Sequence, residues 1–559
     1  MSRYPRSAAS ALGARLFIIA LGVLHLAPIG HAGAQTPSLQ PTEAVLHVNQ
    51  RHARATDQSD GSADAPFRTI QAACQRALLL RAQGQRVRVA IHEGIYRESI
   101  SIGESTLRPD APQLVIEGIE PNVAVSGSDV LPVLGPDRTN VRSIVWRYRW
   151  GQAAIPEGWD PVAPTLRSQP VVLRSEMLFV GGTLLQQVMS ADDVHAGDGR
   201  YWVEESPSDA VPGTVWWTPQ AAADDAAAVA QDAAVEVAVR PSLFSASRIG
   251  NLVVRGITFR HAATPLQEAA VRVTASAKVL FEDLHVEWNN WYGLAVYESQ
   301  NVTLRRVAAN NNGAGGVTAW RVRQLVVEDV QASYNNWRGA WGGFTGWATG
   351  QKFFSLHDAR FTRYQAIGNR ATGLWFDTDH ADVLIEDSRL CDNLTSGLVV
   401  QAVQGPLTVR DSVICRNGET GLLATTAADV TLEGNIINGN GEHQVDLPWQ
   451  SSEHEVSHDR NYETGETMAT RSERWTMKRN LIEGDGQSVL FSVGQWPEFL
   501  TTLQSDENEW VHSSQRDVMG LYPAVNEPMV RFDFEYWRVM SRQDGSSPFI
   551  LTSAGGPSN

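Results

Sequence analysis

Two aspartates separated by one residue carry the clearest chemical signal in this chain. They lie in the stretch 373–380, where apolar residues alternate with Trp375, Asp377 and Asp379. If this stretch is a strand, its period of two places the indole and both carboxylates on one outward face. The alternation therefore predicts two carboxyl groups beside an aromatic ring on an exposed surface.

Two neighbouring carboxyl groups are the minimal equipment for glycoside hydrolysis. One gives a proton to the leaving oxygen, while the other attacks the sugar or activates a water molecule. Close like charges raise the pKa of one group, which makes it a usable acid near neutral pH. The alternative is a solvated pair of aspartates at a turn, where this residue type is common. We expect Asp377 and Asp379 to be catalytic, because Trp375 and His380 flank them.

A segment rich in Gly and Trp, residues 340–352, precedes these aspartates, contains Trp347 and ends in Lys352. Loops on rigid scaffolds often carry binding residues. Counting along the repeat described below places Lys352 almost beside Asp377, where its ammonium could hold the carboxylate ionised or bond a sugar hydroxyl. The alternative is an ordinary surface lysine. Further polar candidates, each more often structural when taken alone, are His357, Arg338, Arg363 and His380.

A repeat in the middle of the chain determines where these residues lie. An Asn-x-x-x-Gly pattern recurs at Asn289/Gly293, Asn312/Gly316, Asn335/Gly339, Asn369/Gly373, Asn393/Gly397 and Asn417/Gly421. Four of the five intervals are 23 or 24 residues, and the interval from Asn335 to Asn369 is 34 residues. A fixed period of this length predicts a solenoid, in which stacked repeats bury one continuous core.

Short apolar-alternating segments within each repeat predict β-strands, for example at 302–304, 383–385 and 407–409. Alternation assigns one set of side chains to the interior and the other to solvent. With the interrupted repeat left aside, the residues four positions after each repeat glycine fall on the outward side and are Tyr297, Trp320, Asp377, Gln401 and Thr425. A line of aromatic, acidic and amide groups along a solenoid predicts a groove for an oligosaccharide.

The N-terminal segment predicts export. Basic residues precede the apolar run 16–29, which is too short to span a bilayer, and Ala32-Gly33-Ala34 is a small-residue cleavage site. We therefore expect a signal peptide at 1–34, cleavage near Ala34 and a secreted or periplasmic protein. The remaining predicted regions are an N-terminal cap with a helix and the first coils at 35–129, an inserted antiparallel β domain at 130–248, the central coils with the groove at 249–448, and the last coils and a cap at 449–559.

The composition of the chain limits the classes of binding partner that we expect. The chain has 46 Lys and Arg residues against 62 Asp and Glu residues, a net charge of −16, which argues against nucleic acid and against an anionic membrane surface. It argues only weakly against anionic polysaccharides, for which a local basic patch is enough. Beyond the signal peptide no stretch is apolar enough to span a bilayer, and no phosphate-loop, dinucleotide or zinc motif stands in a sensible position. We expect no membrane insertion, no metal and no cofactor.

Three cysteines, Cys74, Cys391 and Cys415, are too few for a disulfide scaffold. The last two are 24 residues apart, which is one coil, and the spacing of about 4.8 Å between neighbouring strands allows a disulfide between them. An unbonded pair of small apolar side chains is the open alternative.

Two sets of motifs resemble known proteins. Gly61-x-x-x-x-Pro-Phe-x-Thr-Ile-Gln-x-Ala, followed by Gly94-x-Tyr-x-Glu, resembles the entry of secreted carbohydrate-active proteins with a right-handed parallel β-helix. The Gly-rich segment ending in Lys352, with Gly-Leu-Trp-Phe-Asp-x-Asp at 373–379 and Ser-Gly-Leu-Val-Val-Gln at 396–401, is similar to β-helix glycoside hydrolases of families 120 and 141 over residues 44–448. The resemblance implies an all-β fold, a right-handed parallel β-helix solenoid.

The same resemblance implies roles for the site residues. The family's nucleophile matches Asp377, and its acid/base is a Glu one coil later, where this chain has Gln401. Because an amide cannot transfer the proton, three alternatives are open: Asp379 takes the acid role, Asp377 and Asp379 act as an inverting pair, or hydrolysis has been lost. The residues expected to bind the sugar are Trp375, Gln401, Trp320, Tyr297, His380, Arg338 and Trp347.

Two other functions compete with hydrolysis. A polysaccharide lyase would act on a uronate polymer by β-elimination, with Lys352 and Arg363 as base and cation and with Asp377, Asp379 and Asp382 as ligands of Ca²⁺. A glycan-binding solenoid without catalysis is favoured by Gln401. The partner expected in every case is an oligo- or polysaccharide.

Overall fold

The computed structural model describes residues 43–131, 174–195, 197–204, 214–218, 234–339, 351–448, 461, 464–467, 471–494, 496–524 and 527–552. The predicted signal peptide and Trp347 lie outside the described residues. Among the described residues no helix is both long and apolar enough to cross a bilayer.

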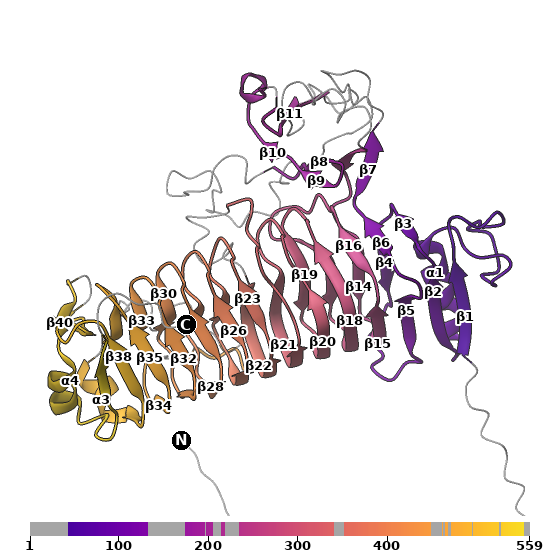
Figure 1. Ribbon diagram of the computed structural model, residues 1–559. Helices are drawn as coiled ribbons and strands as arrows, with labels where there is room; N and C mark the ends of the chain where they lie inside the picture. Colours follow the sequence, from indigo (N-terminus) through magenta and orange to yellow (C-terminus); the bar gives the residue numbers. More distant parts are fainter. Residues whose placement is uncertain are drawn as a thin grey trace, which may run out of the picture. The chain divides into compact units, whose positions relative to one another are not determined.

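Stacked coils form three parallel ladders of strands, here called ladders A, B and C (Figure 1). Ladder A consists of β4 (Ile100–Gly103), β14 (Phe244–Ser247), β17 (Ala269–Thr274), β19 (Tyr292–Tyr297), the first parts of β21 (Val317–Glu328) and β22 (Gln351–Thr362), β24 (Leu374–Asp377), β27 (Leu398–Gln401), β30 (Thr420–Thr425), β33 (His443–Leu447), β36 (Val489–Val493) and β39 (Met519–Leu521).

Ladder B follows ladder A in each coil across a sharp corner. It consists of β1 (Glu43–Val48), β2 (Arg86–Ile91), β5 (Leu114–Gly118), β15 (Gly250–Arg255), the first parts of β18 (Ala277–Glu287) and β20 (Gln300–Ala308), the second parts of β21 and β22, β25 (Ala381–Glu386), β28 (Leu407–Arg410), β31 (Val430–Glu433), β34 (Thr476–Lys478) and β37 (Gln504–Asp506).

Ladder C completes each coil. It consists of β3 (Gly94–Tyr96), β6 (Val123–Ser126), β16 (Thr258–Arg260), the ends of β18 and β20, β23 (Gln365–Ile367), β26 (Arg389–Cys391), β29 (Val413–Cys415), β32 (Ile436–Asn438), β35 (Leu481–Gly484), β38 (Glu509–His512) and β41 (Phe549–Leu551). The pairings within the three ladders are parallel, which confirms the predicted parallel β solenoid.

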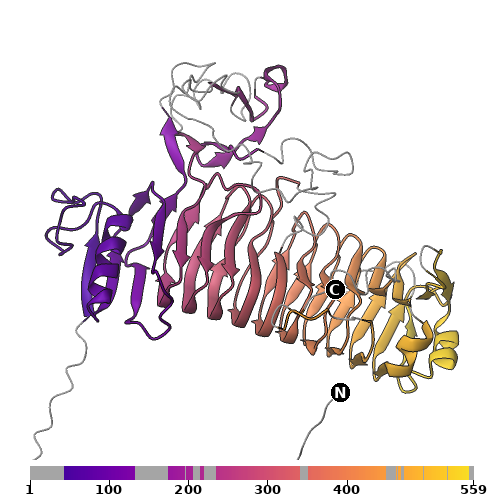
Figure 2. The same ribbon diagram turned by 180° about the vertical axis from the view of Figure 1, so that it is seen from behind.

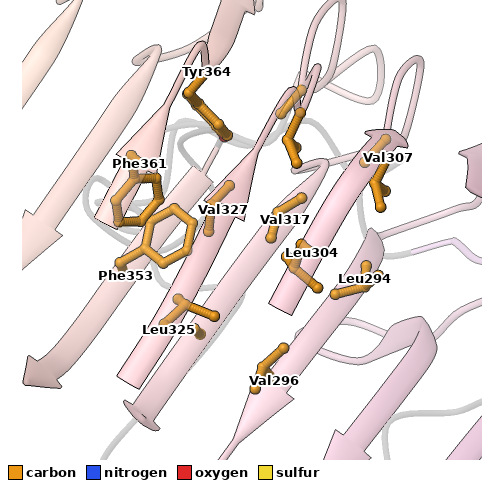
Figure 3. Close-up of a cluster of buried hydrophobic side chains, with 14 of the residues drawn as sticks. Leu294, Val296, Leu304, Val307, Val317, Leu325, Val327, Phe353, Phe361 and Tyr364 are labelled. Atoms are coloured by element: carbon orange, nitrogen blue, oxygen red, sulfur yellow. The ribbon is translucent and has the colours of Figure 1, made fainter. Parts of the chain in front are cut away.

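Alternating apolar side chains fill the space between the ladders. Residues predicted to point inward, such as Leu294, Val296, Val317 and Leu398, have no exposed surface, and Figure 3 shows the first three within one cluster. Where β22 passes through this cluster, Phe353 and Phe361 meet edge to face at 5.0 Å between ring centroids. One continuous apolar core therefore runs through the coils.

The repeat asparagines form a buried ladder of hydrogen bonds in the turn between ladders C and A. The side-chain oxygen of Asn393, for example, accepts from the backbone N–H and the side-chain amide of Asn369 at 3.1 and 2.9 Å. The same contacts link the neighbouring members from Asn289 to Asn440, all of which are at most 2 % exposed. Asn440 is a seventh member that the pattern did not predict, because Gln444 instead of glycine follows it and closes the ladder with its own amide.

The repeat glycines leave room for this ladder. A Cβ added to Gly397 would lie 2.5 Å from the side-chain nitrogen of Asn417, and one added to Gly373 would lie 2.6 Å from that of Asn393. Gly339 differs, because nothing lies within 4 Å of its Cβ position. In the Asn335/Gly339 pair, therefore, only the asparagine has the structural role of the repeat.

In the eight successive coils from β14 to β30, a residue in the left-handed region turns the chain from ladder A to ladder B. These corner residues have φ between 47° and 56° and are Arg248, Ala275, Glu298, Arg321, Ser355, Thr378, Ala402 and Thr426. This conformation is unfavourable for residues other than glycine, and stacking of the same bend in successive coils maintains it here.

The N-terminal cap is the predicted helix, α1 (Ile70–Ala82). Thr69 accepts from the N–H of Ala72, and Glu98 accepts from the N–H groups of Ile70 and Gln71, so the first turn is capped twice. The helix lies against the first coils (Figure 2), and its apolar residues belong to the continuous core. At the other end the chain forms α3 (Trp496–Thr502), β40 (Val530–Phe532) and α4 (Phe534–Ser541).

The insertion contains the expected antiparallel strands. One sheet pairs β7 (Ser128–Leu131), β8 (Leu178–Val180), β9 (Thr183–Leu184) and β13 (Val235–Ala238). A second contains β10 (Gln186–Gln187), β11 (Arg200–Glu204) and β12 (Thr214–Trp217), in which the β10–β11 pair is parallel, and a 3₁₀ turn, η3, covers Ala191–Asp193. Ladder A resumes at Phe244, shortly before the expected boundary at 249.

Cys391 and Cys415 are joined by a disulfide between neighbouring coils of ladder C, with their Cα atoms 4.5 Å apart. Of the two alternatives left open by the sequence, the structure contains the bonded pair. Cys74 is a buried free thiol in α1.

Candidate active site

The predicted outward line of residues is present on ladder A. Strand register aligns Tyr297, Trp320, Phe354, Asp377, Gln401 and Thr425 in successive coils. Trp320 is 38 % exposed, whereas Thr425 is buried. Phe354 fills the place of the interrupted repeat, which counting forward from Gly339 does not reach because residues 340–350 intervene. This line is called the outward column below.

Asp377 and Lys352 form an ion pair on this face. The Lys352 Nζ lies 2.5 Å from Oδ2 of Asp377 and 4.4 Å from the centre of the Trp375 ring, while Thr378 Oγ1 donates to Oδ1 of Asp377 at 2.8 Å. Lys352 is in register with Trp375, so its side chain reaches diagonally to Asp377. Both side chains are only about one seventh exposed, and their attraction is therefore stronger than that of a surface pair. The expectation that Lys352 lies beside Asp377 is confirmed.

Asp379 does not share the outward face with Asp377, so this expectation is wrong. The strand β24 ends at Asp377, and Thr378 and Asp379 both have positive φ, which breaks the alternation. Asp379 is 3 % exposed. Its carboxylate accepts from Ser355 Oγ at 2.8 Å and lies 3.2 Å from Nε2 of His357. It therefore stabilises the corner between ladders A and B.

His380 is an interior residue and cannot contact a sugar in the groove, contrary to our expectation. Its Nδ1 accepts from the N–H of Leu356, and its Nε2 carries the proton because it faces the carbonyl oxygens of Phe353 and Asp377 at 3.2 and 3.1 Å. Burial lowers the pKa of His380 to about 4. The ring is neutral and supports the backbone on which Asp377 lies.

Arg338 connects the insertion to the coils, so its predicted role in sugar binding is also wrong. Its guanidinium donates to Asn290 Oδ1, Gln187 Oε1 and the carbonyl of Glu176 at 2.7, 2.6 and 2.5 Å. The residue is 6 % exposed. Because its partners in the insertion are more than a hundred residues away in the sequence, no local sequence pattern predicts this contact.

The residues expected for a lyase are not brought together. Arg363 follows β22 at the corner between ladders B and C, where its guanidinium pairs with Glu328 and Asp329. Lys352 lies at the other end of β22 on ladder A. Asp377, Asp379 and Asp382 do not converge either, and within the described ranges no group of three or more His, Cys, Asp or Glu could hold a metal ion.

The face therefore offers one charged carboxylate–ammonium pair, aromatic rings and an amide. Asp377 and Gln401 are neighbours in register, and parallel strands are about 4.8 Å apart. A carboxylate in this position can attack or stabilise an electrophilic carbon, and the rings can cover the apolar faces of a sugar. Sequence reasoning missed Phe354, whose alternation with Lys352 within β22 was the available signal.

Comparisons with known proteins agree with this architecture. A family model described as a right handed beta helix region matches residues 269–437. No curated protein sequence matches the chain. The fold resembles that of XylC in its complex with xylose, with a TM-score of 0.66 and 14 % identity over 84 % of this chain and 83 % of that one.

Two further solved structures resemble this chain less closely than XylC does. The A-module of the mannuronan C-5 epimerase AlgE6 from Azotobacter vinelandii has a TM-score of 0.48 and 14 % identity, with 87 % of this chain and 96 % of that one covered. The catalytic domain of a GH87 alpha-1,3-glucanase has a TM-score of 0.44 and 8 % identity, with 87 % and 67 % covered. The parallel ladders, the matching family model and the likeness to XylC show the predicted right-handed parallel β-helix fold.

Proposed function

We propose that the protein is an exported carbohydrate-active enzyme that hydrolyses a glycosidic bond of an oligo- or polysaccharide bound along ladder A. The ion pair between Lys352 and Asp377 within the outward column supports this proposal most strongly. A partly buried carboxylate held by an ammonium in a line of aromatic and amide groups has little structural purpose of its own, because the core and the asparagine ladder already hold the coils together.

Asp377 is the carboxylate that acts on the anomeric carbon. Lys352 and Thr378 hold both of its oxygens, so that it attacks or stabilises the positively charged sugar in one orientation. In the covalent course, an oxygen of Asp377 bonds to the anomeric carbon, the bond to the leaving oxygen breaks, and water later cleaves the ester. Trp320, Tyr297, Trp375 and Phe354 supply rings for neighbouring sugar units.

Gln401 provides a hydrogen bond but no proton. Among the described residues of the outward column, Asp377 is the sole carboxylate, so the leaving oxygen takes its proton from water or from a group outside this column. We therefore expect substrates with good leaving groups, such as aryl glycosides, to be cleaved much faster than unactivated oligosaccharides.

The substitution Gln401→Glu tests the proposal. It places a carboxyl group one coil from Asp377, near the separation of about 5 Å at which retaining glycosidases carry their pair. We predict a gain of about 10²-fold in turnover of unactivated oligosaccharides, because general acid catalysis contributes at least this much, and a smaller gain on aryl glycosides.

The control is Gln401→Asn, which keeps an amide and should show no gain. The measurement is product release by the mature chain from Gln35 onward on a glycan panel, followed by mass and ultraviolet absorbance. Products that absorb as unsaturated sugars would identify elimination instead of hydrolysis. Binding without any turnover in both the native chain and the Glu variant would identify a glycan-binding solenoid.

A further inference from the structure

A groove of about 710 Å³ lies along the corner between ladders A and B. It extends over successive coils from β14 to β22, and the polar residues that line it include Arg248, Glu298, Arg321, Arg323, Ser355 and His357. Three of these are arginines and one is a glutamate, although the chain as a whole has a net charge of −16. The groove is therefore a local basic region on an acidic protein.

The basic character stops at the coil of Asp377. On the N-terminal side of that coil three of the five corner residues are charged, Arg248, Glu298 and Arg321, and the other two are Ala275 and Ser355, whereas the three corner residues from that coil onward are Thr378, Ala402 and Thr426. These last three are buried and uncharged. The corner position thus carries a charge in three of the five coils before the candidate site and in none of the three coils from Thr378 to Thr426.

The groove reaches β22, the strand next to the one that carries Asp377. Ser355 and His357 line the groove, and both contact the carboxylate of Asp379, two residues beyond Asp377. Trp320 in the outward column immediately precedes Arg321. Arg323 and His357 are register partners in neighbouring coils. A sugar unit stacked on Trp320 would therefore have its substituents within reach of these arginines.

We propose that this groove binds an anionic substituent of the glycan, a carboxylate or a sulfate ester, on sugar units that lie on the N-terminal side of Asp377. The planar guanidinium donates two parallel hydrogen bonds to such oxyanions. Arg321 is 3.2 Å from Glu298, but both side chains are about two fifths exposed, and an exposed pair of this kind exchanges partners at little cost. The inference rests on the proposed glycan function and specifies its substrate class.

Binding to the full mature chain carrying Asp377→Asn tests this inference without interference from turnover. The probes are oligosaccharides of matched length that are neutral, uronate-bearing or sulfated, and the readout is calorimetric affinity at low and high salt. We expect at least one anionic series to bind about tenfold more tightly than the neutral series at low salt, with the advantage reduced by salt. The uronate and sulfate arms show which oxyanion the groove prefers.

The variant Arg321→Gln/Arg323→Gln should reduce the affinity for the anionic series to that for the neutral series and leave neutral binding unchanged. Arg248→Gln should give a smaller loss in the same direction. The control is Arg389→Gln, which removes the same charge from an exposed position of ladder C and should have no effect.

Equal affinity for neutral and anionic probes, an equal loss in the Arg389 control, or no binding of any probe would overturn the inference. A different result is expected if only the proposed glycoside hydrolysis is wrong. In that case the native chain turns over no glycan, while the preference for the anionic series and its dependence on the two arginines remain.

Discussion

The turn between ladders C and A and the outward column lie only a few residues apart in each coil, yet they are built in opposite ways. In the turn, the same residue type occurs in coil after coil, from Asn289 to Asn440, and each side chain bonds the next. In the outward column the residue type changes in each coil from Tyr297 to Thr425. Repetition marks the residues that hold the coils together, and variation marks the residues available for chemistry.

The difference follows from burial. A buried amide must satisfy its donors and acceptor within the protein, and an identical neighbour at the same register does so in each coil up to Asn440, where Gln444 takes this place. An outward side chain exchanges protein contacts for water at little cost. Because a substitution on the outward face costs little free energy of unfolding, one coil can carry Asp377 and the next Gln401.

Removing one member of the asparagine ladder should have the largest effect on stability. Asn393→Ala removes the acceptor for two groups of Asn369 and the donor to the carbonyl of Ala366 at 2.9 Å. We expect a loss of about 3 kcal/mol or more, because several buried polar groups lose their partners. Urea unfolding of the chain from Gln35 onward measures it. Gln401→Ala in the outward column should change stability by less than about 0.5 kcal/mol, and equal losses would contradict the comparison.

Acid should weaken the interior through His380. Its pKa of about 4 in the folded chain lies below the ordinary value of 6.5, so the unfolded chain takes up the proton first as the pH falls. The free energy of unfolding contributed by the neutral ring is complete above pH 6.5 and decreases by about 3 kcal/mol on acidification to pH 4.

His380→Gln should flatten this part of the curve of unfolding free energy against pH. The exposed His285→Gln should leave the curve unchanged. An unchanged slope in the His380 variant would show that the ring is not the buried neutral group described above.

A methyl group at a repeat glycine should have a smaller effect. In Gly397→Ala the new Cβ lies 2.5 Å from the Asn417 side-chain nitrogen and 2.6 Å from a methyl of Ile414, so the coils must shift, at a cost of about 1–3 kcal/mol. Gly545→Ala, where nothing lies within 4 Å, should be nearly neutral. Thermal melting of the two variants compares them, and similar melting temperatures would contradict this explanation of the repeat.

Much of the fold could be predicted, because the determinants are periodic. The asparagine spacing predicts the coils, and the alternation around Leu294 and Leu398 predicts which side chains are inside. Asn440 was missed because its partner is Gln444 instead of glycine. Phe354 was missed because residues 340–350 interrupt the forward count from Gly339.

The candidate site could be predicted only where the strand geometry continues. Asp377 lies within β24, and Lys352 within β22, so counting placed both correctly. Asp379 and His380 follow Thr378, whose backbone is in the left-handed region. Threonine rarely adopts this conformation, so the sequence did not predict the bend. Arg338 contacts the insertion, and no local pattern encodes a partner more than a hundred residues away.

We propose that Asp377 is the reactive carboxylate and that Asp379 is a structural one. The most direct test compares Asp377→Asn with Asp379→Asn in the mature chain, by turnover of a cleavable glycan and by thermal melting. We predict that Asp377→Asn loses at least about 10³-fold in turnover while its melting temperature and glycan binding are kept. Asp379→Asn should melt lower and lose far less turnover per folded molecule. Near-native turnover in Asp377→Asn, or the large loss in Asp379→Asn at unchanged stability, would contradict these two roles.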